Sequence, residues 1–266
     1  MSEQSDPLSL AIDKRDREIL STVSDALRTG RTLFAFQPVV SASDPTRVAF
    51  HSAFMRLRDT SGRIIPARDF MPQVEMSELG RMIDTKAITL ALQALRTYPT
   101  LRLSIKVSAR SVSYRPWLTI LNRALDAEDE LGERLILDFT ETSVIAVPDL
   151  ITGFMDDVQM RGVSFGLDGF GAGATSFRCL RDMFFDVVKL DGDFVQDIHQ
   201  NLDNQVLVKA LISVCKSFDM FSVGVKVSNQ KDADFLIDAG IDCLQGFHFG
   251  APTTSLDETM ETAKSA

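Results

Sequence analysis

Hydrophobic residues recur at helical spacing near the start of the chain and then in short strand-like runs. Over residues 13–29 the apolar positions are three and four residues apart and Gly30 follows, which predicts an amphipathic helix with a glycine cap. The runs LFAFQPVV and VAFHSAFMRLR come next, separated by a polar turn, and predict two strands. Residues 67–98, interrupted by Pro72, predict two or three helices.

Downstream of Tyr98, brief apolar runs alternate with amphipathic stretches. The strand-like runs are RLSIKVS, RLILDFT, VSFGLDGF, DVVKLD, FSVGVKVS and DCLQGFHF. The helices predicted between them cover 116–130, 148–161, 174–183, 203–217 and 230–239. This alternation is typical of crossover units around a parallel sheet. With the two early strands the total is eight, the number that closes an α/β barrel of roughly 250 residues.

No segment rich in Gly, Pro or Ser interrupts this series, so we expect one domain over residues 13–258, with the helix 13–29 included. Polar residues dominate 1–12 and 259–266, which we expect to be flexible tails. Neither a signal peptide nor an apolar run of membrane-spanning length is present, which predicts a soluble cytoplasmic protein.

The chain has 266 residues, of which 45% are hydrophobic and 24% charged, and this balance excludes a disordered protein or a small disulfide scaffold. Its net charge is −9 and its pI about 4.9, so we expect no binding to nucleic acid or to anionic membranes. Cys179, Cys215 and Cys243 are widely spaced among apolar residues and predict buried free thiols in a reducing compartment.

Polar residues end many of the predicted strands, and in parallel barrels those ends surround the ligand site. A single one is best explained as a satisfied core group or a solvated strand end. Their recurrence in so many strands indicates a shared cavity instead. These residues are Gln37, Ser52, Arg56, Lys106, Asp138, Asp168, Lys189, Asp191, Lys226 and Gln245.

Several ordered segments carry a family resemblance: FAFQPVV, SAFMR, VSAR, LDFTETS, LDGFGAG, VVKLDGDFV and LQGFHFGAP. In order and spacing they resemble the EAL family of bacterial cyclic di-GMP phosphodiesterases, over about Leu33 to Pro252. The resemblance implies a modified TIM barrel with outer helices, whose first strand is antiparallel to its neighbour. It also implies a site for a cyclic dinucleotide and two divalent metals, Mg²⁺ or Mn²⁺.

The sequence departs from the family pattern where metals would bind. Ser52 replaces the Glu that begins the naming motif, Lys106 replaces a metal-binding Asn, and Asp138 replaces a longer Glu. Gly169 follows Asp168 where the family has a second Asp. The family's AEGVET segment aligns with residues 224–229, in which both Glu positions are lost.

These departures predict that metal binding is lost and that no cofactor is used. A lysine about 4 Å from a divalent ion opposes its binding by roughly 4 kcal/mol per unit charge at an effective dielectric near 20. We expect Lys106 to form a salt bridge with Asp138 or Asp168, because neighbouring parallel strands bring their ends together. The prediction is therefore that the chain is not an enzyme, with Asp138, Asp168 and Lys189 as vestiges of a catalytic site.

Three functional hypotheses follow from the resemblance. The first is a catalytically inactive receptor or signalling adaptor that binds cyclic di-GMP and acts through contacts with a protein partner. The second is a protein-interaction module without a nucleotide, and the third is a residual phosphodiesterase. A homodimer contact at residues 169–173 is also implied. The residues expected to contact the ligand are Gln37, Phe54, Arg56, Lys106, Asp168, Asp191 and Gln245.

Overall fold

The computed structural model describes residues 7–173 and 177–257. Its strands are β1 (Thr32–Ser41), β2 (Val48–Arg58), β3 (Ile64–Pro66), β4 (Leu103–Lys106), β5 (Leu135–Thr140), β6 (Ser164–Phe170), β7 (Val187–Leu190), β8 (Phe221–Gly224) and β9 (Cys243–Leu244). Its α-helices are α1 (Pro7–Arg28), α2 (Met71–Val74), α3 (Glu78–Thr97), α4 (Arg115–Ala127), α5 (Glu141–Ala146), α6 (Pro148–Gln159), α7 (Phe177–Asp182), α8 (Gly192–Val195), α9 (Leu202–Ser217) and α10 (Gln230–Asp238). Short 3₁₀ turns are η1 (Ala67–Asp69), η2 (Asp129–Arg134) and η3 (Ile198–Gln200).

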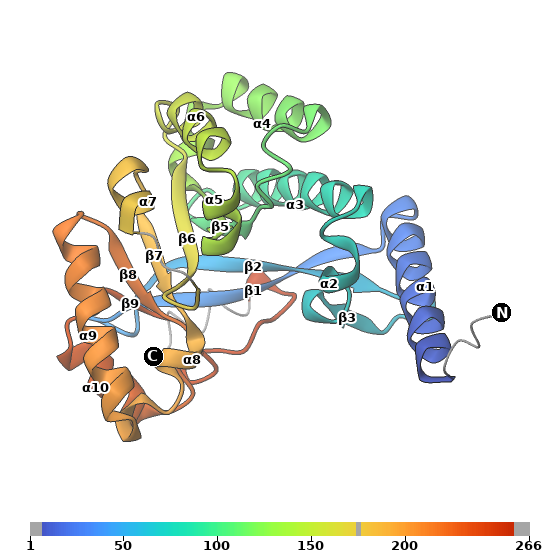
Figure 1. The fold of residues 1–266 in the computed structure, drawn as a ribbon. Helices are drawn as coiled ribbons and strands as arrows, with labels where there is room; N and C mark the ends of the chain where they lie inside the picture. The colour runs from blue at the N-terminus through green and yellow to red at the C-terminus, as the bar shows by residue number, and fades with distance from the viewer. Residues whose placement is uncertain (1–6, 174–176, 258–266) are drawn as a thin grey trace.

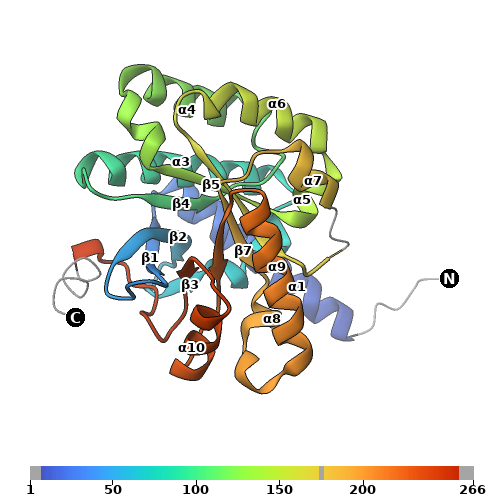
Figure 2. The ribbon, with the colours of Figure 1, turned by 90° about the vertical axis from the view of Figure 1, so that its left-hand side faces the viewer.

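Eight of these strands close into a barrel, in the order β1, β9, β8, β7, β6, β5, β4, β2 and back to β1, with β3 added at the outer edge of β2. The strand β1 is antiparallel to both β2 and β9, and the other barrel pairs are parallel. The loop between β1 and β2 is too short for a crossover, which forces the antiparallel pair. The predicted eight-stranded barrel with a reversed first strand is confirmed, and its helices lie outside the strands (Figures 1 and 2).

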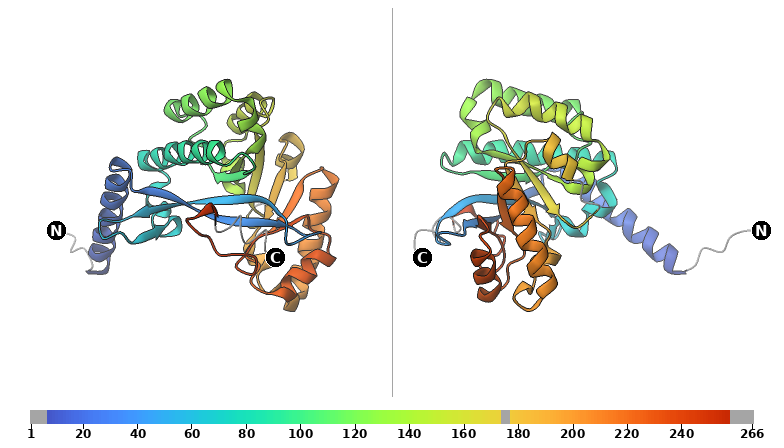
Figure 3. Two further views of the ribbon diagram at one scale, coloured as in Figure 1. Left: turned by 180° about the vertical axis from the view of Figure 1, so that it is seen from behind. Right: turned by 60° about the vertical axis from the view of Figure 1, so that its left-hand side comes forward.

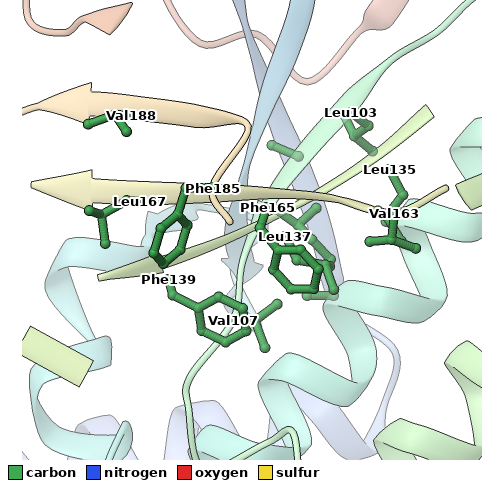
Figure 4. Close-up of a cluster of buried hydrophobic side chains, with 14 of the residues drawn as sticks. Leu103, Val107, Leu135, Leu137, Phe139, Val163, Phe165, Leu167, Phe185 and Val188 are labelled. Carbon is green, nitrogen blue, oxygen red and sulfur yellow. The ribbon is translucent and has the colours of Figure 1, made fainter. Parts of the chain in front are cut away.

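The helices cover the barrel because one face of each is apolar. Helix α3 begins at the Ser77 cap, whose hydroxyl accepts a hydrogen bond from the Leu79 amide, and it buries Ile83, Ile88 and Leu95 against the strands. Aromatic rings fill the layer between α6 and the sheet, where Phe154 contacts both Phe139 and Phe165 edge-on. Figure 4 shows part of this layer, with Phe139, Phe165 and Phe185 among the aliphatic side chains of β4 to β7.

The lower interior of the barrel is filled by a separate apolar layer. Alternate residues of a strand point to opposite faces of the sheet, so one residue from each of six strands points inward at this level. This layer closes the barrel below the polar residues described next. Its buried members are Val39, Phe50, Ile136, Val187, Val223 and Cys243.

Element boundaries differ from the predictions mainly at the N-terminus. Helix α1 begins at Pro7 rather than at residue 13, so half of the predicted tail 1–12 is helical. Pro at the first helical position supports this early start. The short strand β3 was not predicted from the sequence. Residues 1–6 and 258–266, which contain the predicted C-terminal tail, lie outside the described residues, as do the first three of the predicted helix 174–183.

Two further expectations concern membranes and cysteines. Among the described residues, no helix combines the length and the apolar character needed to cross a bilayer. Cys215 and Cys243 are buried free thiols, and burial raises the pKa of Cys215 to about 12 and that of Cys243 to about 11. The side chain of Cys179 is outside the described part of the chain.

Candidate ligand-binding site at the barrel mouth

Polar side chains occupy the upper half of the barrel interior, above the apolar layer. We call this opening, at the carboxyl ends of the parallel strands, the mouth, and we define it by Arg56, Lys106 and Asp168. Register places the strands so that Lys106 lies beside Asp138 and Asp168 lies beside Lys189. The structure therefore brings most of the residues predicted from the strand ends into one site.

Deep in the barrel, Lys189 and Asp138 form a buried ion pair that we call the inner pair. The Lys189 ammonium also donates to Ser104 Oγ at 2.9 Å and to Ser52 Oγ at 3.2 Å, so its three donors are all used. The Ser104 hydroxyl donates to Asp138 Oδ2. Only 4% of the Lys189 side chain and 2% of the Asp138 side chain are exposed. Ser104 was missed in the sequence, where the single hydroxyl in LSIK gives no distinguishing signal.

The neighbouring strand β6 makes room for this carboxylate with a glycine. A Cβ at Gly166 would lie 1.9 Å from Asp138 Oδ1, so no other residue type fits without displacing the aspartate. That oxygen has no hydrogen-bond partner among the described residues. The Asp138 carboxylate thus accepts hydrogen bonds from Lys189 and Ser104 on one side, and the Gly166 backbone packs closely against its other side.

Nearer the mouth, Lys106 and Asp168 form a second ion pair, the outer pair, which confirms the salt bridge predicted for Lys106. Its members are more open, with 56% of the Lys106 side chain and 17% of that of Asp168 exposed. Burial opposes the charge on each group. The attraction between them prevails, so the pKa of Lys106 is raised and that of Asp168 is lowered, the latter with help from Lys189.

The loop that follows Lys106 is anchored by a buried carboxylate on α3. Asp84 accepts hydrogen bonds from the Ser108 amide at 3.0 Å and the Ser111 hydroxyl at 2.6 Å. Burial raises the pKa of Asp84 to about 6, and the two hydrogen bonds only partly oppose this effect. Asp84 therefore holds the backbone behind Lys106 without a cation of its own among the described residues.

Arg56 lies at the mouth on β2, with its guanidinium carbon 5.9 Å from the centre of the Phe54 ring. One of its nitrogens donates to the Met55 carbonyl oxygen at 3.0 Å. Partial burial lowers the pKa of Arg56, with a smaller contribution from Arg68. No ion pair to Arg56 occurs within residues 7–173 and 177–257. The nearby strand-end carboxylate of Glu141 accepts from the Gly171 amide at 3.3 Å. The remaining donors of Arg56 are therefore available to an anionic ligand.

The two predicted glutamines bind each other. Gln245 donates to Gln37 Oε1 at 3.1 Å, and Gln37 donates to the Gly250 carbonyl oxygen at 2.9 Å. Both side chains are buried. They tie the end of β9 to β1 and to the loop 246–250, which we call the β9 loop. Two further predicted positions lie at the edge of the mouth: Asp191 caps α8 by accepting from the Asp193 amide at 2.8 Å, and Lys226 pairs with Asp193 at 2.8 Å.

The charged residues at the mouth do not fit a pair of divalent cations. Such a pair needs several carboxylate oxygens that are free to coordinate. Asp138 and Asp168 are each bonded to an ammonium group, and the described residues contain no cluster of three His, Cys, Asp or Glu side chains that could hold a metal.

Comparison with known proteins establishes the family. The model of the EAL domain matches residues 20–252, so the chain belongs to the EAL domain family. It is 26% identical over 246 residues to the cyclic di-GMP phosphodiesterase PdeB of Shewanella oneidensis, covering 90% of this chain and 29% of that protein. It is also 26% identical over 231 residues to PdeR of Escherichia coli, another cyclic di-GMP phosphodiesterase, covering 85% and 35%. The chain thus spans about a third of the length of these relatives.

Solved structures share the fold. The EAL domain of FimX from Pseudomonas aeruginosa bound to c-di-GMP superposes with a TM-score of 0.81 at 23% identity, covering 89% of this chain and 97% of that one. The FimX EAL domain of Xanthomonas citri in complex with c-di-GMP gives a TM-score of 0.79 at 23% identity, covering 92% and 98%.

One prediction is contradicted by these findings. The chain was expected not to be an enzyme, but its relatives are named phosphodiesterases, so its family is one of enzymes. The error lay in deriving the class of protein from the charges of individual ligand positions. Those charges bear on how a cation or an anion is held at the mouth, whereas the class follows from the family as a whole.

Proposed function

We propose that this EAL domain binds cyclic di-GMP at the mouth of its barrel, with Arg56 and Lys106 as the groups that contact the phosphates. The observation that carries the proposal is that two cations lie at the mouth, one that forms no ion pair among the described residues and the other largely exposed. Guanidinium and ammonium groups are the usual protein partners of phosphate. The two FimX EAL domains, with the same fold, are complexes with this dinucleotide.

The proposal includes binding without a divalent cation. Arg56, Lys106 and Lys189 are cations on the barrel strands, and Asp138 and Asp168 are the carboxylates paired with the two lysines. The two lysines are each paired with an aspartate, and Arg56 forms no ion pair among the described residues, so its charge can meet a ligand phosphate without a metal. A receptor role, in which the loaded domain contacts a protein partner, is consistent with such binding.

Titration calorimetry with cyclic di-GMP, in EDTA and then in Mg²⁺, tests this proposal. We expect micromolar or tighter affinity in both buffers. Arg56→Ala should weaken binding by about 1.5–3 kcal/mol, the range for a hydrogen bond to a charged group. Arg123→Ala, an exposed arginine on α4, is the matched control and should leave the affinity unchanged. If the wild-type protein fails to bind at millimolar ligand, the proposal is wrong and a nucleotide-free interaction module becomes the better explanation.

Hydrolysis of cyclic di-GMP is the second candidate function, because it is the activity named for the relatives. Conversion of the dinucleotide to linear pGpG, followed by chromatography in Mg²⁺ or Mn²⁺, measures it directly. Turnover that disappears in Asp168→Asn would assign the activity to this site.

A further inference from the structure

The β9 loop carries an aromatic ring, Phe247, that was not among the residues expected to contact the ligand. The Phe247 side chain is 72% exposed, although the residues on either side of it are bound to the barrel. Two other strongly exposed phenylalanines, Phe184 and Phe221, precede β7 or begin β8 and thus lie at the opposite end of the strands. Phe247 follows the carboxyl end of β9 and therefore stands at the ligand-binding end.

The backbone around Phe247 is fixed in place by several contacts. The Val227 amide donates to the Gln245 carbonyl oxygen at 3.0 Å, and the His248 amide donates to the Val227 carbonyl oxygen at 3.2 Å. A Cβ at Gly246 would lie 1.9 Å from the Val227 carbonyl oxygen. The loop therefore packs so closely against the segment after β8 that only glycine fits at position 246. The loop thus holds the backbone of Phe247 in a defined position.

The buried glutamines complete this support. Gln37 reaches from β1 to the Gly250 carbonyl oxygen, at the far end of the β9 loop, and Gln245 fixes the orientation of Gln37. Replacing Gln37 by a shorter side chain would leave the Gly250 carbonyl and the Gln245 amide without these partners. Both glutamines therefore stabilise the position of the β9 loop.

We infer that Phe247 is a stacking surface for a purine base of the ligand, and that Gln37 and Gln245 are positioning residues that hold it there. The inference rests on the proposed function and adds to it a second aromatic ring, two strands away from Phe54 around the barrel, since β1 separates β9 from β2. An exposed aromatic ring on a rigid loop loses little conformational freedom when a base stacks on it. Base stacking on aromatic side chains is tolerant of sequence and strong enough to be measured.

The first experiment compares Phe247→Ala with Phe184→Ala by calorimetry with cyclic di-GMP. Phe247→Ala should weaken binding about tenfold or more, the lower part of the range for a stacked base, and Phe184→Ala should not change it. Both residues are exposed, so neither variant should lose its fold, and circular dichroism verifies this. If Arg56→Ala loses affinity while Phe247→Ala does not, the proposed function stands and this inference falls. If the wild type does not bind, both fall.

A fluorescent variant tests the stacking and the positioning separately. Trp117, the single tryptophan of the chain, is fully buried and provides a constant background. In Phe247→Trp, saturating cyclic di-GMP should quench the new emission, whereas in Phe184→Trp it should not. Adding Gln37→Ala to Phe247→Trp should reduce the quenching at saturation. In the Gln37→Ala/Phe247→Ala double variant the loss should be clearly smaller than the product of the single losses. Independent losses would show that Gln37 contacts the ligand directly and would overturn the positioning role.

Discussion

The barrel contains two lysine–aspartate pairs that differ in depth more than in chemistry. The inner pair, Lys189 with Asp138, is almost completely excluded from water and lies beside two serine hydroxyl groups and the Phe50 ring. The outer pair, Lys106 with Asp168, opens to solvent at the mouth. The free energy of a charged group depends on how far it is removed from water, so the two pairs have different roles. The inner pair stabilises the packing of the barrel interior. The outer pair is open enough for Lys106 to bind a ligand.

The difference follows from the inventory of donors and acceptors. Lys189 has no donor left for a ligand, since all three are directed at Asp138, Ser104 and Ser52. Lys106 has one carboxylate partner and an exposed stem, so a phosphate can approach its ammonium while Asp168 stays in contact. The comparison yields three predictions of decreasing size.

The largest effect is expected from Lys189→Met. It would leave the Asp138 carboxylate buried without a cation, and removing one partner of a buried pair lowers the free energy of unfolding by about 3–5 kcal/mol. Urea denaturation measures this change. The double variant Lys189→Met/Asp138→Asn removes both charges and should recover much of the loss. A loss below about 1 kcal/mol in the single variant would contradict the distinction between the pairs.

The second effect concerns a buried carboxylate without a lysine. The raised pKa of Asp84 means that the folded state prefers the protonated form, so wild-type stability should fall as the pH rises from about 4 to about 6. Asp84→Asn keeps an oxygen acceptor for Ser108 and Ser111 and removes the buried charge. We expect it to raise the free energy of unfolding by about 2 kcal/mol above pH 6 and by almost nothing near pH 4. Urea denaturation across this pH range is the measurement, and a gain independent of pH would refute the assignment.

The smallest effect on stability is expected from Lys106→Met. An exposed ion pair contributes about 0–1 kcal/mol, so the free energy of unfolding should change by less than 1 kcal/mol. The affinity for cyclic di-GMP should nevertheless fall about fivefold, close to 1 kcal/mol. Lys231→Met, an exposed lysine on α10, is the control. If Lys106→Met lowers the free energy of unfolding as much as Lys189→Met does and leaves the affinity for cyclic di-GMP unchanged, the outer pair stabilises the fold and does not bind the ligand.

The sequence predicted the barrel better than the details of its interior. Strand periodicity and eight strand-like runs indicated a barrel, because each run had to bury one face, and the family resemblance implied its reversed first strand. The salt bridge of Lys106 was predictable from adjacent strand ends. The inner pair was not, because Lys189 and Asp138 are on strands separated by β6, and only the barrel's curvature and the missing side chain of Gly166 let them meet.

The glutamines illustrate a different limit. Gln37 and Gln245 were expected to face the ligand because polar residues at strand ends usually face a cavity. They lie where expected, but their amides are largely used on each other and on Gly250. The sequence places a side chain at a strand end and cannot show which neighbour its amide will bind. Phe247 was missed for a related reason, since an aromatic residue in an apolar run predicts burial.

The reversed direction of β1 has a practical consequence for attaching other groups to this domain. Thr32, at the beginning of β1, pairs with Leu57 near the end of β2, so α1 approaches the barrel from the mouth side (Figure 3). In an ordinary parallel barrel the first strand would begin at the opposite end. A fluorescent reporter or surface tether attached to the last turn of α1, near Arg28, would therefore lie at the mouth end of the barrel, where it can sense or obstruct nucleotide exchange. A linker there needs enough length to keep an immobilised domain open to its ligand.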